Sequence, residues 1–110
     1  MPALGHETEI DGTWKGKSVC QVKRSGCRDE AVVYTARQSG PDSHEIFTYR
    51  IEAGRTVRTG RISGYYTDAR TFTAWGPDSW IFTIKGDHMS GRIVSPRGRL
   101  LRVIEVDRIK

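Results

Sequence analysis

The sequence has no long apolar segment. No uninterrupted hydrophobic run approaches the ~18 residues that cross a bilayer as a helix, and the mean hydropathy is −0.54. The first five residues, Met1 to Gly5, carry no apolar core of the kind that a signal peptide needs. We therefore expect a soluble protein without a membrane span.

The sequence also lacks the residue clusters that catalysis and metal binding require. His6, His44 and His88 are far apart, no nucleophile motif pairs a serine or cysteine with one of them, and no glycine-rich phosphate loop is present. We predict that the protein is not an enzyme and has no cofactor or metal ion. One alternative stays open, because His44 and His88 are expected at the same end of the fold as Asp42 and Asp87, where they could form a surface metal site.

Only two cysteines are present, Cys20 and Cys27, and they flank a turn at Ser25-Gly26. Two directly opposed residues of antiparallel strands lie ~5.5 Å apart between their Cα atoms, which is the separation that a disulfide needs. Disulfides persist mainly in oxidising compartments. We therefore predict a disulfide and a secreted or periplasmic protein whose signal peptide is absent from this sequence. A cytoplasmic protein with two free thiols is the alternative.

Acidic residues are outnumbered. The formal net charge is +5 and the pI is near 9.6. Thirteen of the eighteen basic residues are arginine. This balance permits nucleic acid, anionic lipid or small anions as partners, and it is equally compatible with an arginine-rich solvated surface.

The apolar pattern is that of short strands. Residues 1–11 are polar and aperiodic and are expected to form a flexible lead-in, so residues 12–110 form a single domain. From Gly12 onward, strand patterns recur every 8–12 residues with turn residues between them. Eight such strands predict an all-β antiparallel up-and-down barrel, and a two-sheet β-sandwich is the alternative. The expected strands cover residues 13–23, 29–38, 45–53, 57–66, 70–75, 79–85, 88–95 and 99–109.

The first strand opens with Gly12-Thr13-Trp14. This G-x-W motif resembles that of the lipocalins and their calycin relatives. The stretch that continues through Cys20, Cys27, Asp29-Glu30 and Val32-Val33-Tyr34 is similar to small bacterial lipocalin-like proteins of uncharacterised function. The chain is shorter than a lipocalin and shows no C-terminal helix, so a compact, avidin-like barrel is the closer shape.

The resemblance implies that Trp14 plugs the closed end of the barrel and that an arginine of the last strand packs over it. Arg102 and Arg108 share the parity of Leu100, Ile104 and Val106, and Arg108 is the better partner because it lies at the height of Trp14. A cation–π contact of ~1–2 kcal/mol would join them. In the opposite phase, Leu101 and Val103 would point inward and both arginines would lie in water.

An up-and-down barrel also sorts the loops between its two ends. Arginine and lysine gather at the rim that is the open mouth in calycins, where they could attract a carboxylate or phosphate. Alternatively, the gathering of arginine and lysine at this rim is due to chance in an arginine-rich chain. The basic residues of this rim are Lys23, Arg24, Arg28, Arg55, Arg58, Arg97 and Arg99, against Asp29, Glu30, Glu52 and Asp78.

We predict non-enzymatic binding of a small, partly apolar ligand that can carry negative charge. One alternative is a nucleic-acid or other polyanion-binding barrel with Tyr65 and Trp75 exposed for stacking. The other is a structural or interaction module whose barrel is filled by Trp14, Phe47, Trp80, Phe82 and Met89. The oligomeric state is not defined by the sequence. The expected pocket is lined by Tyr49, Ile62, Tyr66, Phe72, Phe82 and Arg102, with Arg55, Arg58 and Arg97 at its mouth.

Overall fold

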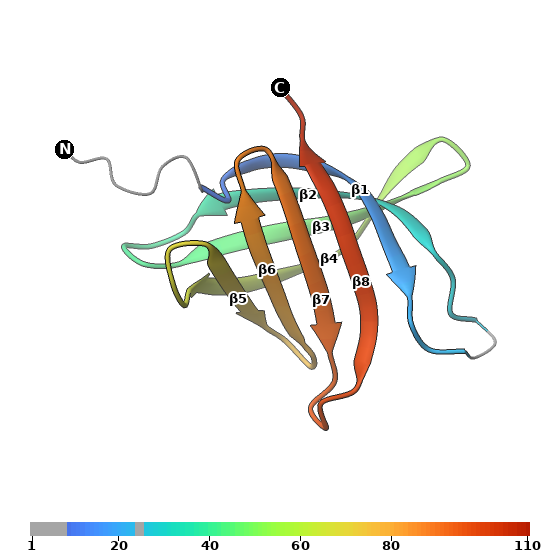
Figure 1. The fold of residues 1–110 in the computed structure, drawn as a ribbon. Coiled ribbons are helices and arrows are strands. Elements are labelled where there is room, and N and C mark those ends of the chain that lie inside the picture. The colour runs from blue at the N-terminus through green and yellow to red at the C-terminus, as the bar shows by residue number, and fades with distance from the viewer. Residues whose placement is uncertain (1–8, 24–25) are drawn as a thin grey trace.

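The computed structural model describes residues 9–23 and 26–110 and shows an all-β protein. Its strands run antiparallel in sequence order around a closed barrel in which β1 also pairs with β8 (Figure 1). This confirms the predicted eight-stranded up-and-down barrel, and the sandwich alternative is wrong. The strands are β1 (Gly12–Cys20), β2 (Glu30–Gln38), β3 (His44–Glu52), β4 (Arg55–Tyr66), β5 (Thr71–Trp75), β6 (Ser79–Lys85), β7 (His88–Val94) and β8 (Leu100–Arg108).

The alternation of strand directions gives the barrel two distinct ends. The β1–β2, β3–β4, β5–β6 and β7–β8 loops lie at one end, here called the open end, and the start of β1 lies at the other, the closed end. The described part of the chain contains no helix of the length and hydrophobicity that a membrane crossing requires.

The β3–β4 turn is shorter than predicted. The expected turn over residues 53–56 is a two-residue turn at Ala53-Gly54, with φ of +50° and +77°, so β4 begins at Arg55. Positive φ at both central residues is the geometry that matches the twist of paired strands. The resulting β3–β4 hairpin projects from the open end of the barrel (Figure 1).

The hydrophobic core fills the barrel from the closed end to its middle. Large apolar side chains on the inward faces of the strands exclude water there, which is the main stabilising term for a domain of this size. Fully buried members are Ile10, Trp14, Ile46, Phe72, Ala74, Phe82, Ile84, Met89, Ile104 and Val106.

The first half of strand β3, before the register shift at Thr48/Tyr49, has the opposite phase from the prediction. Ile46 and Thr48 are buried inside the barrel, whereas Phe47, predicted to point inward, lies on the outer face under the guanidinium groups of Arg37 and Arg58. Alternate residues of β3 form two sets, one with Ile46 and Thr48 and the other with Phe47. The large aromatic ring of Phe47 lies on the outer face, although it is the more hydrophobic choice for the core. The Phe47 ring is covered by the two arginine side chains instead of by core residues.

Strand β8 mostly has the predicted phase. Ile104 and Val106 are fully buried, so the alternative phase is wrong for this part of the strand. Leu100, however, was expected to point inward and is 40% exposed, while Leu101 packs against the core. The register between β7 and β8 shifts at Ile93/Val94, and a bulge of this kind reverses the facing of the residues beyond it.

The closed end is plugged as predicted by Trp14 and Arg108. These residues are directly paired across β1 and β8, Trp14 is fully buried, and the guanidinium carbon of Arg108 lies 4.3 Å from the centre of its ring. The same guanidinium donates hydrogen bonds to the main-chain oxygens of Glu9 at 2.6 Å and Asp11 at 2.5 Å.

The folded domain begins earlier in the chain than the predicted residue 12. Ile10 is fully buried, its carbonyl accepts a hydrogen bond from the Trp14 indole at 2.8 Å, and its amide donates one to the Tyr66 hydroxyl at 2.7 Å. Residues 9–11 therefore belong to the folded domain, because they complete the plug. The remainder of the predicted lead-in lies outside the described residues.

The predicted disulfide joins Cys20 and Cys27, with a Cα–Cα distance of 6.1 Å. It closes the loop that follows β1 at the open end, and the Cys20 amide donates a further hydrogen bond to the Asp29 carboxylate at 3.0 Å. The loop that leads into β2 is thus attached to the end of β1 at two points.

Candidate functional site

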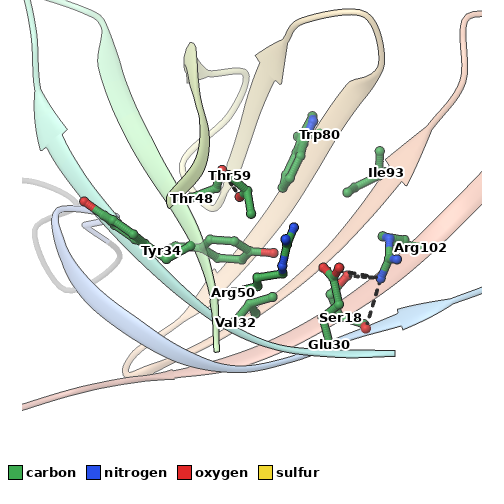
Figure 2. Close-up of a pocket in the computed structure, with 11 residues that line it drawn as sticks. Ser18, Glu30, Val32, Tyr34, Thr48, Arg50, Thr59, Trp80, Ile93 and Arg102 are labelled. Carbon is green, nitrogen blue, oxygen red and sulfur yellow. Dashed lines mark hydrogen bonds and ion pairs between the residues drawn. The ribbon is translucent and has the colours of Figure 1, made fainter. Parts of the chain in front are cut away.

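A cavity of about 230 Å³ lies inside the open half of the barrel, beyond the last large side chains of the core (Figure 2). Its position follows from the topology, because the open ends of β1, β2, β3, β4, β6, β7 and β8 contribute to it. The residues that line it are Ser18, Glu30, Val32, Tyr34, Thr48, Tyr49, Arg50, Thr59, Trp80, Ile93 and Arg102.

The cavity lining has an apolar and a polar part. Val32, Trp80 and Ile93 supply hydrocarbon and aromatic surface. Hydroxyl groups come from five further residues, of which Thr48 and Thr59 bond each other at 2.8 Å. Small-molecule sites usually have mostly apolar walls with a few placed polar groups; this cavity is more polar, because only three of its eleven lining residues are apolar. The volume corresponds to about seven or eight waters, which suits a short-chain or single-ring molecule.

Arg102 is held in place at the edge of this cavity. Its guanidinium donates hydrogen bonds to the main-chain oxygen of Ser18 at 3.2 Å, to the Ser18 hydroxyl at 3.1 Å and to the main-chain oxygen of Arg28 at 2.8 Å. The side chain is only 20% exposed. Because carbonyl and hydroxyl oxygens neutralise no charge, the cation keeps its ability to attract an anion.

The cavity lining contains two guanidinium groups and one carboxylate, and a second carboxylate, outside the lining, pairs with one of the guanidinium groups. Glu30 lies 3.9 Å from the Arg102 guanidinium, a long separation for an ion pair. Arg50 also lines the cavity and pairs at 2.7 Å with Glu52 near the strand end. Two guanidinium groups and one carboxylate therefore face the space.

Tyr34 reaches from β2 into the barrel (Figure 2). Its ring makes edge contacts with Trp80 and Phe82, with centroids 6.1 Å apart in both cases. Burial raises the pKa of the Tyr34 phenol far above its ordinary value, Glu30 raises this pKa further, and Arg102 lowers it. The group therefore stays a neutral hydroxyl, which can donate a hydrogen bond to an anionic oxygen.

Two of the predicted pocket residues line this cavity, namely Tyr49 and Arg102. The other four do not. Phe72 and Phe82 are fully buried in the core, and Ile62 and Tyr66 pack against it. Tyr66 belongs to the closed end, where its hydroxyl accepts the Ile10 amide.

The predicted mouth arginines lie outside the cavity. Arg55, Arg58 and Arg97 are all exposed, and Arg58 covers Phe47 on the outer face of β3. Another basic residue assigned to the same rim, Arg24, lies outside the described residues. The basic rim is thus divided between the tips of separate hairpins and the outer wall.

Several lining residues were missed by the sequence argument. Tyr34 could have been found, because Val32, Tyr34 and Ala36 alternate in β2 and all three are buried. Arg50 and Thr59 could not, because their facing depends on the phase of β3 and on the register shift at Thr48/Tyr49.

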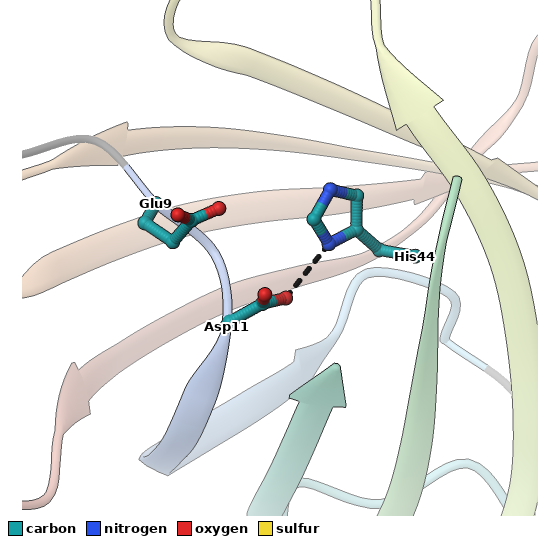
Figure 3. A group of neighbouring side chains, drawn as sticks. All are labelled: Glu9, Asp11 and His44. Atoms are coloured by element: carbon teal, nitrogen blue, oxygen red, sulfur yellow. Dashed lines mark hydrogen bonds and ion pairs between the residues drawn. The ribbon is translucent and has the colours of Figure 1, made fainter. Parts of the chain in front are cut away.

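A second polar group lies at the closed end, where Glu9, Asp11 and His44 come together (Figure 3). One ligand atom from each lies within 4.8 Å of the others, and His44 Nδ1 bonds the Asp11 carboxylate at 2.7 Å. The His44 ring also makes edge contacts with Tyr66 and Phe72. Such donors could hold a divalent cation, but the His44–Asp11 bond also serves to fasten residues 9–11 to the barrel.

His88 is part of a different cluster on the outer wall and does not approach His44. Its two ring nitrogens bond Asp107 at 2.8 Å and Glu105 at 2.7 Å, and Ser90 lies 3.4 Å from the same ring. The order Ser90–His88–Asp107 is that of a hydrolase triad. However, the Ser90 hydroxyl donates to Glu105 rather than to the imidazole. Both ring nitrogens of His88 bond carboxylates, Asp107 first, which raise its pKa and favour the doubly protonated ring, so no free ring nitrogen is available to take the serine proton.

Comparison with known proteins finds no matching family model, no matching curated protein and no matching solved structure. The arguments for function therefore come from the geometry of the sites themselves.

Proposed function

We propose that this chain is a non-enzymatic, lipocalin-like binding protein whose open-end cavity takes a small, partly apolar anion. The observation that carries the proposal is the placement of Arg102. Main-chain and hydroxyl oxygens hold its guanidinium at the cavity edge, close to the buried Tyr34 side chain. A fixed guanidinium presents paired donors that suit a carboxylate.

The size and lining of the cavity narrow the ligand class. A space of about 230 Å³ is below the ~300–1,000 Å³ of pockets for drug-sized molecules, so a long fatty acid would not be enclosed. Val32, Trp80 and Ile93 suit a short aliphatic chain or one aromatic ring. Carboxylates of the size of benzoate or hexanoate meet both conditions.

The disulfide supports a location outside the cytoplasm, because such bonds persist mainly in oxidising compartments. The protein would then bind its ligand in the periplasm or in the extracellular medium. The cavity needs no cofactor or metal ion for this role.

The test compares benzoate with benzamide, its neutral counterpart, by isothermal titration calorimetry. Benzoate should bind more tightly, and Arg102→Gln should weaken benzoate binding about 10- to 100-fold, since a hydrogen bond to a charged group contributes about 1.5–3 kcal/mol. Benzamide binding should change little. Tyr34→Phe should weaken benzoate binding by a smaller factor.

Arg97→Gln is the matched control, because it removes the same charge from the exposed β7–β8 loop. It should leave the affinity within about two-fold, as expected for a screened surface charge. The proposal fails if benzoate and benzamide bind alike, if neither they nor hexanoate bind, or if Arg97→Gln has the effect expected of Arg102→Gln.

A further inference from the structure

Strands β2, β3, β4 and β5 carry an unusual outer surface, here called the outer aromatic face. It consists of Arg37, Phe47, Arg58, Arg61, Tyr65 and Trp75. The strand register places these residues together, because Phe47 is paired with Arg61 and Trp75 is paired with Ser63, two residues further along β4. Two strand spacings of ~4.8 Å separate Phe47 from the strand of Trp75.

Two aromatic rings on this face are open to solvent. Tyr65 is 49% exposed and Trp75 is 47% exposed, and their ring centroids lie 5.1 Å apart with an angle of 45° between the planes. The two rings contact each other, and about half of the surface of each side chain stays open to solvent. Large aromatic groups that remain half-exposed on a sheet often mark a binding surface.

Arginine side chains surround the third ring. The guanidinium carbons of Arg37 and Arg58 lie 5.2 Å and 4.7 Å from the centre of Phe47. Glu45 is shared between Arg37 at 2.9 Å and Arg61 at 3.7 Å. Arg58 has no carboxylate partner among the described residues, so three guanidinium groups face one carboxylate.

The opposite wall of the barrel has the reverse character. There, β8 presents Glu105 and Asp107 with His88 between them. Because strand order follows sequence order around the closed barrel, β3 and β4 lie across from β7 and β8 (Figure 1). Among the described residues, the large exposed aromatic rings thus occur on one wall only, whereas cations also lie on the other, Arg92 of β7 among them.

We propose that the outer aromatic face binds single-stranded nucleic acid. The three arginines would contact phosphates, and the Tyr65–Trp75 pair would provide a stacking platform for bases. Proteins that bind single strands without sequence preference combine these two elements, a basic track for the backbone and aromatic rings for the bases. The face lies outside the barrel, so binding there is independent of the cavity.

The test measures fluorescence anisotropy of a labelled single-stranded oligonucleotide with the full chain. At physiological salt we expect a dissociation constant of about 10⁻⁴–10⁻⁶ M, and binding should be tighter at 50 mM salt, because three phosphate contacts give a slope of log K against log salt of about −2. Raising the salt to 200 mM should therefore weaken binding about 15-fold. Tryptophan fluorescence should be quenched on binding, and Trp75→Phe should remove most of that quenching.

Substitutions separate stacking from charge. Trp75→Ala and Tyr65→Ala should each weaken binding about five-fold or more, and Arg58→Glu with Arg61→Glu should abolish most of the salt dependence. Arg92→Glu, on the exposed face of β7, changes the charge by two units, as each single Arg→Glu substitution on the outer aromatic face does. It should leave the affinity within about two-fold of that of the unsubstituted protein, and Arg58→Glu alone is the variant to compare with it. The two rings are half-exposed and contact each other, so Trp75→Ala and Tyr65→Ala should lower the melting temperature only slightly, and circular dichroism should show that each variant remains folded.

Three outcomes overturn the proposal. Binding that is undetectable at 50 mM salt would do so, as would binding that Trp75→Ala and Tyr65→Ala leave intact. Concentration-dependent self-association in sedimentation experiments, lost in Trp75→Ala and unaffected by excess oligonucleotide, would identify the face as an interface between copies of this chain instead.

Discussion

Arg102 donates a 2.8 Å hydrogen bond to the main-chain oxygen of Arg28. Arg28 follows Cys27 directly, so the guanidinium that faces the cavity is attached to the loop that the disulfide closes. The covalent bond and the candidate binding group therefore belong to one structural unit, which begins at the end of β1.

Reduction of the disulfide should affect stability and binding together. Closing a loop of about eight residues stabilises a fold by about 2.5 kcal/mol on chain-entropy grounds, so Cys20→Ser with Cys27→Ser should lower the free energy of unfolding by about that amount. Benzoate affinity should also fall, because Arg28 no longer holds the guanidinium. Urea titration measures the loss of stability and calorimetry measures the benzoate affinity. An unchanged affinity in the folded double variant would show that the loop does not position Arg102.

Gly16 should be intolerant of substitution. It lies between Val32 of β2 and Val106 of β8, and a Cβ atom there would be 2.7 Å from the Val106 Cα and closer still to a main-chain oxygen of Glu105. Main-chain atoms cannot move aside cheaply, so Gly16→Ala should cost about 3 kcal/mol or more.

Gly76→Ala is the matched control for this substitution, because nothing lies within 4 Å of the added Cβ. Its effect should stay within about 0.5 kcal/mol of zero. Chemical denaturation of both variants gives the comparison, and equal losses would contradict the close strand approach at Gly16.

The plug at the closed end predicts a large effect of Arg108→Met. This change keeps an unbranched side chain over Trp14 but removes the cation–π contact and three charge-assisted hydrogen bonds, to Glu9, Asp11 and the Asp87 carboxylate. The free energy of unfolding should fall by about 2–3 kcal/mol, with a change in the near-ultraviolet circular dichroism of Trp14. Arg99→Met, in the exposed β7–β8 loop, should leave the free energy of unfolding almost unchanged. Equal losses in the two variants would show that the contacts of Arg108 contribute little to stability.

The stability should decrease as pH rises above about 6.5 because of His88. Hydrogen bonds to Asp107 and Glu105 raise the pKa of this residue in the folded state. The folded protein therefore holds the proton more tightly than the unfolded chain, whose histidine pKa is about 6.5. The stabilisation is complete below that value and is lost as pH rises through the folded-state pKa.

The pH effect can be measured by NMR titration of His88 and by urea titration across the same range. Asp107→Asn should lower the pKa of His88 and flatten the pH dependence of stability. A His88 that titrates at its ordinary value would show that the two ion pairs do not form in solution.

The strand order and the plug could be predicted from the sequence, whereas the cavity lining largely could not. Turn residues mark the strand ends, and Trp14 and Arg108 fall opposite each other once β1 and β8 pair. In β3, however, the set containing Phe47 alternates as regularly as the set containing Ile46, and period-2 patterns do not say which set faces the core.

Two register shifts, at Thr48/Tyr49 and at Ile93/Val94, added to this difficulty. A bulge changes the facing of every residue beyond it, and both shifts lie near the cavity. Arg102 was identified because the buried residues Ile104 and Val106 fix the phase of its strand, whereas Arg50 depended on the ambiguous phase of β3.

The most direct test of the proposed cavity site is a ¹H–¹⁵N NMR titration of the protein with benzoate. We predict saturable shifts of the Trp80 indole signal and of the amides of Ser18, Val32 and Ile93, all of which line the cavity, and their loss in Arg102→Gln. Shifts confined to the outer aromatic face, or none at millimolar benzoate, would contradict a ligand site inside the barrel.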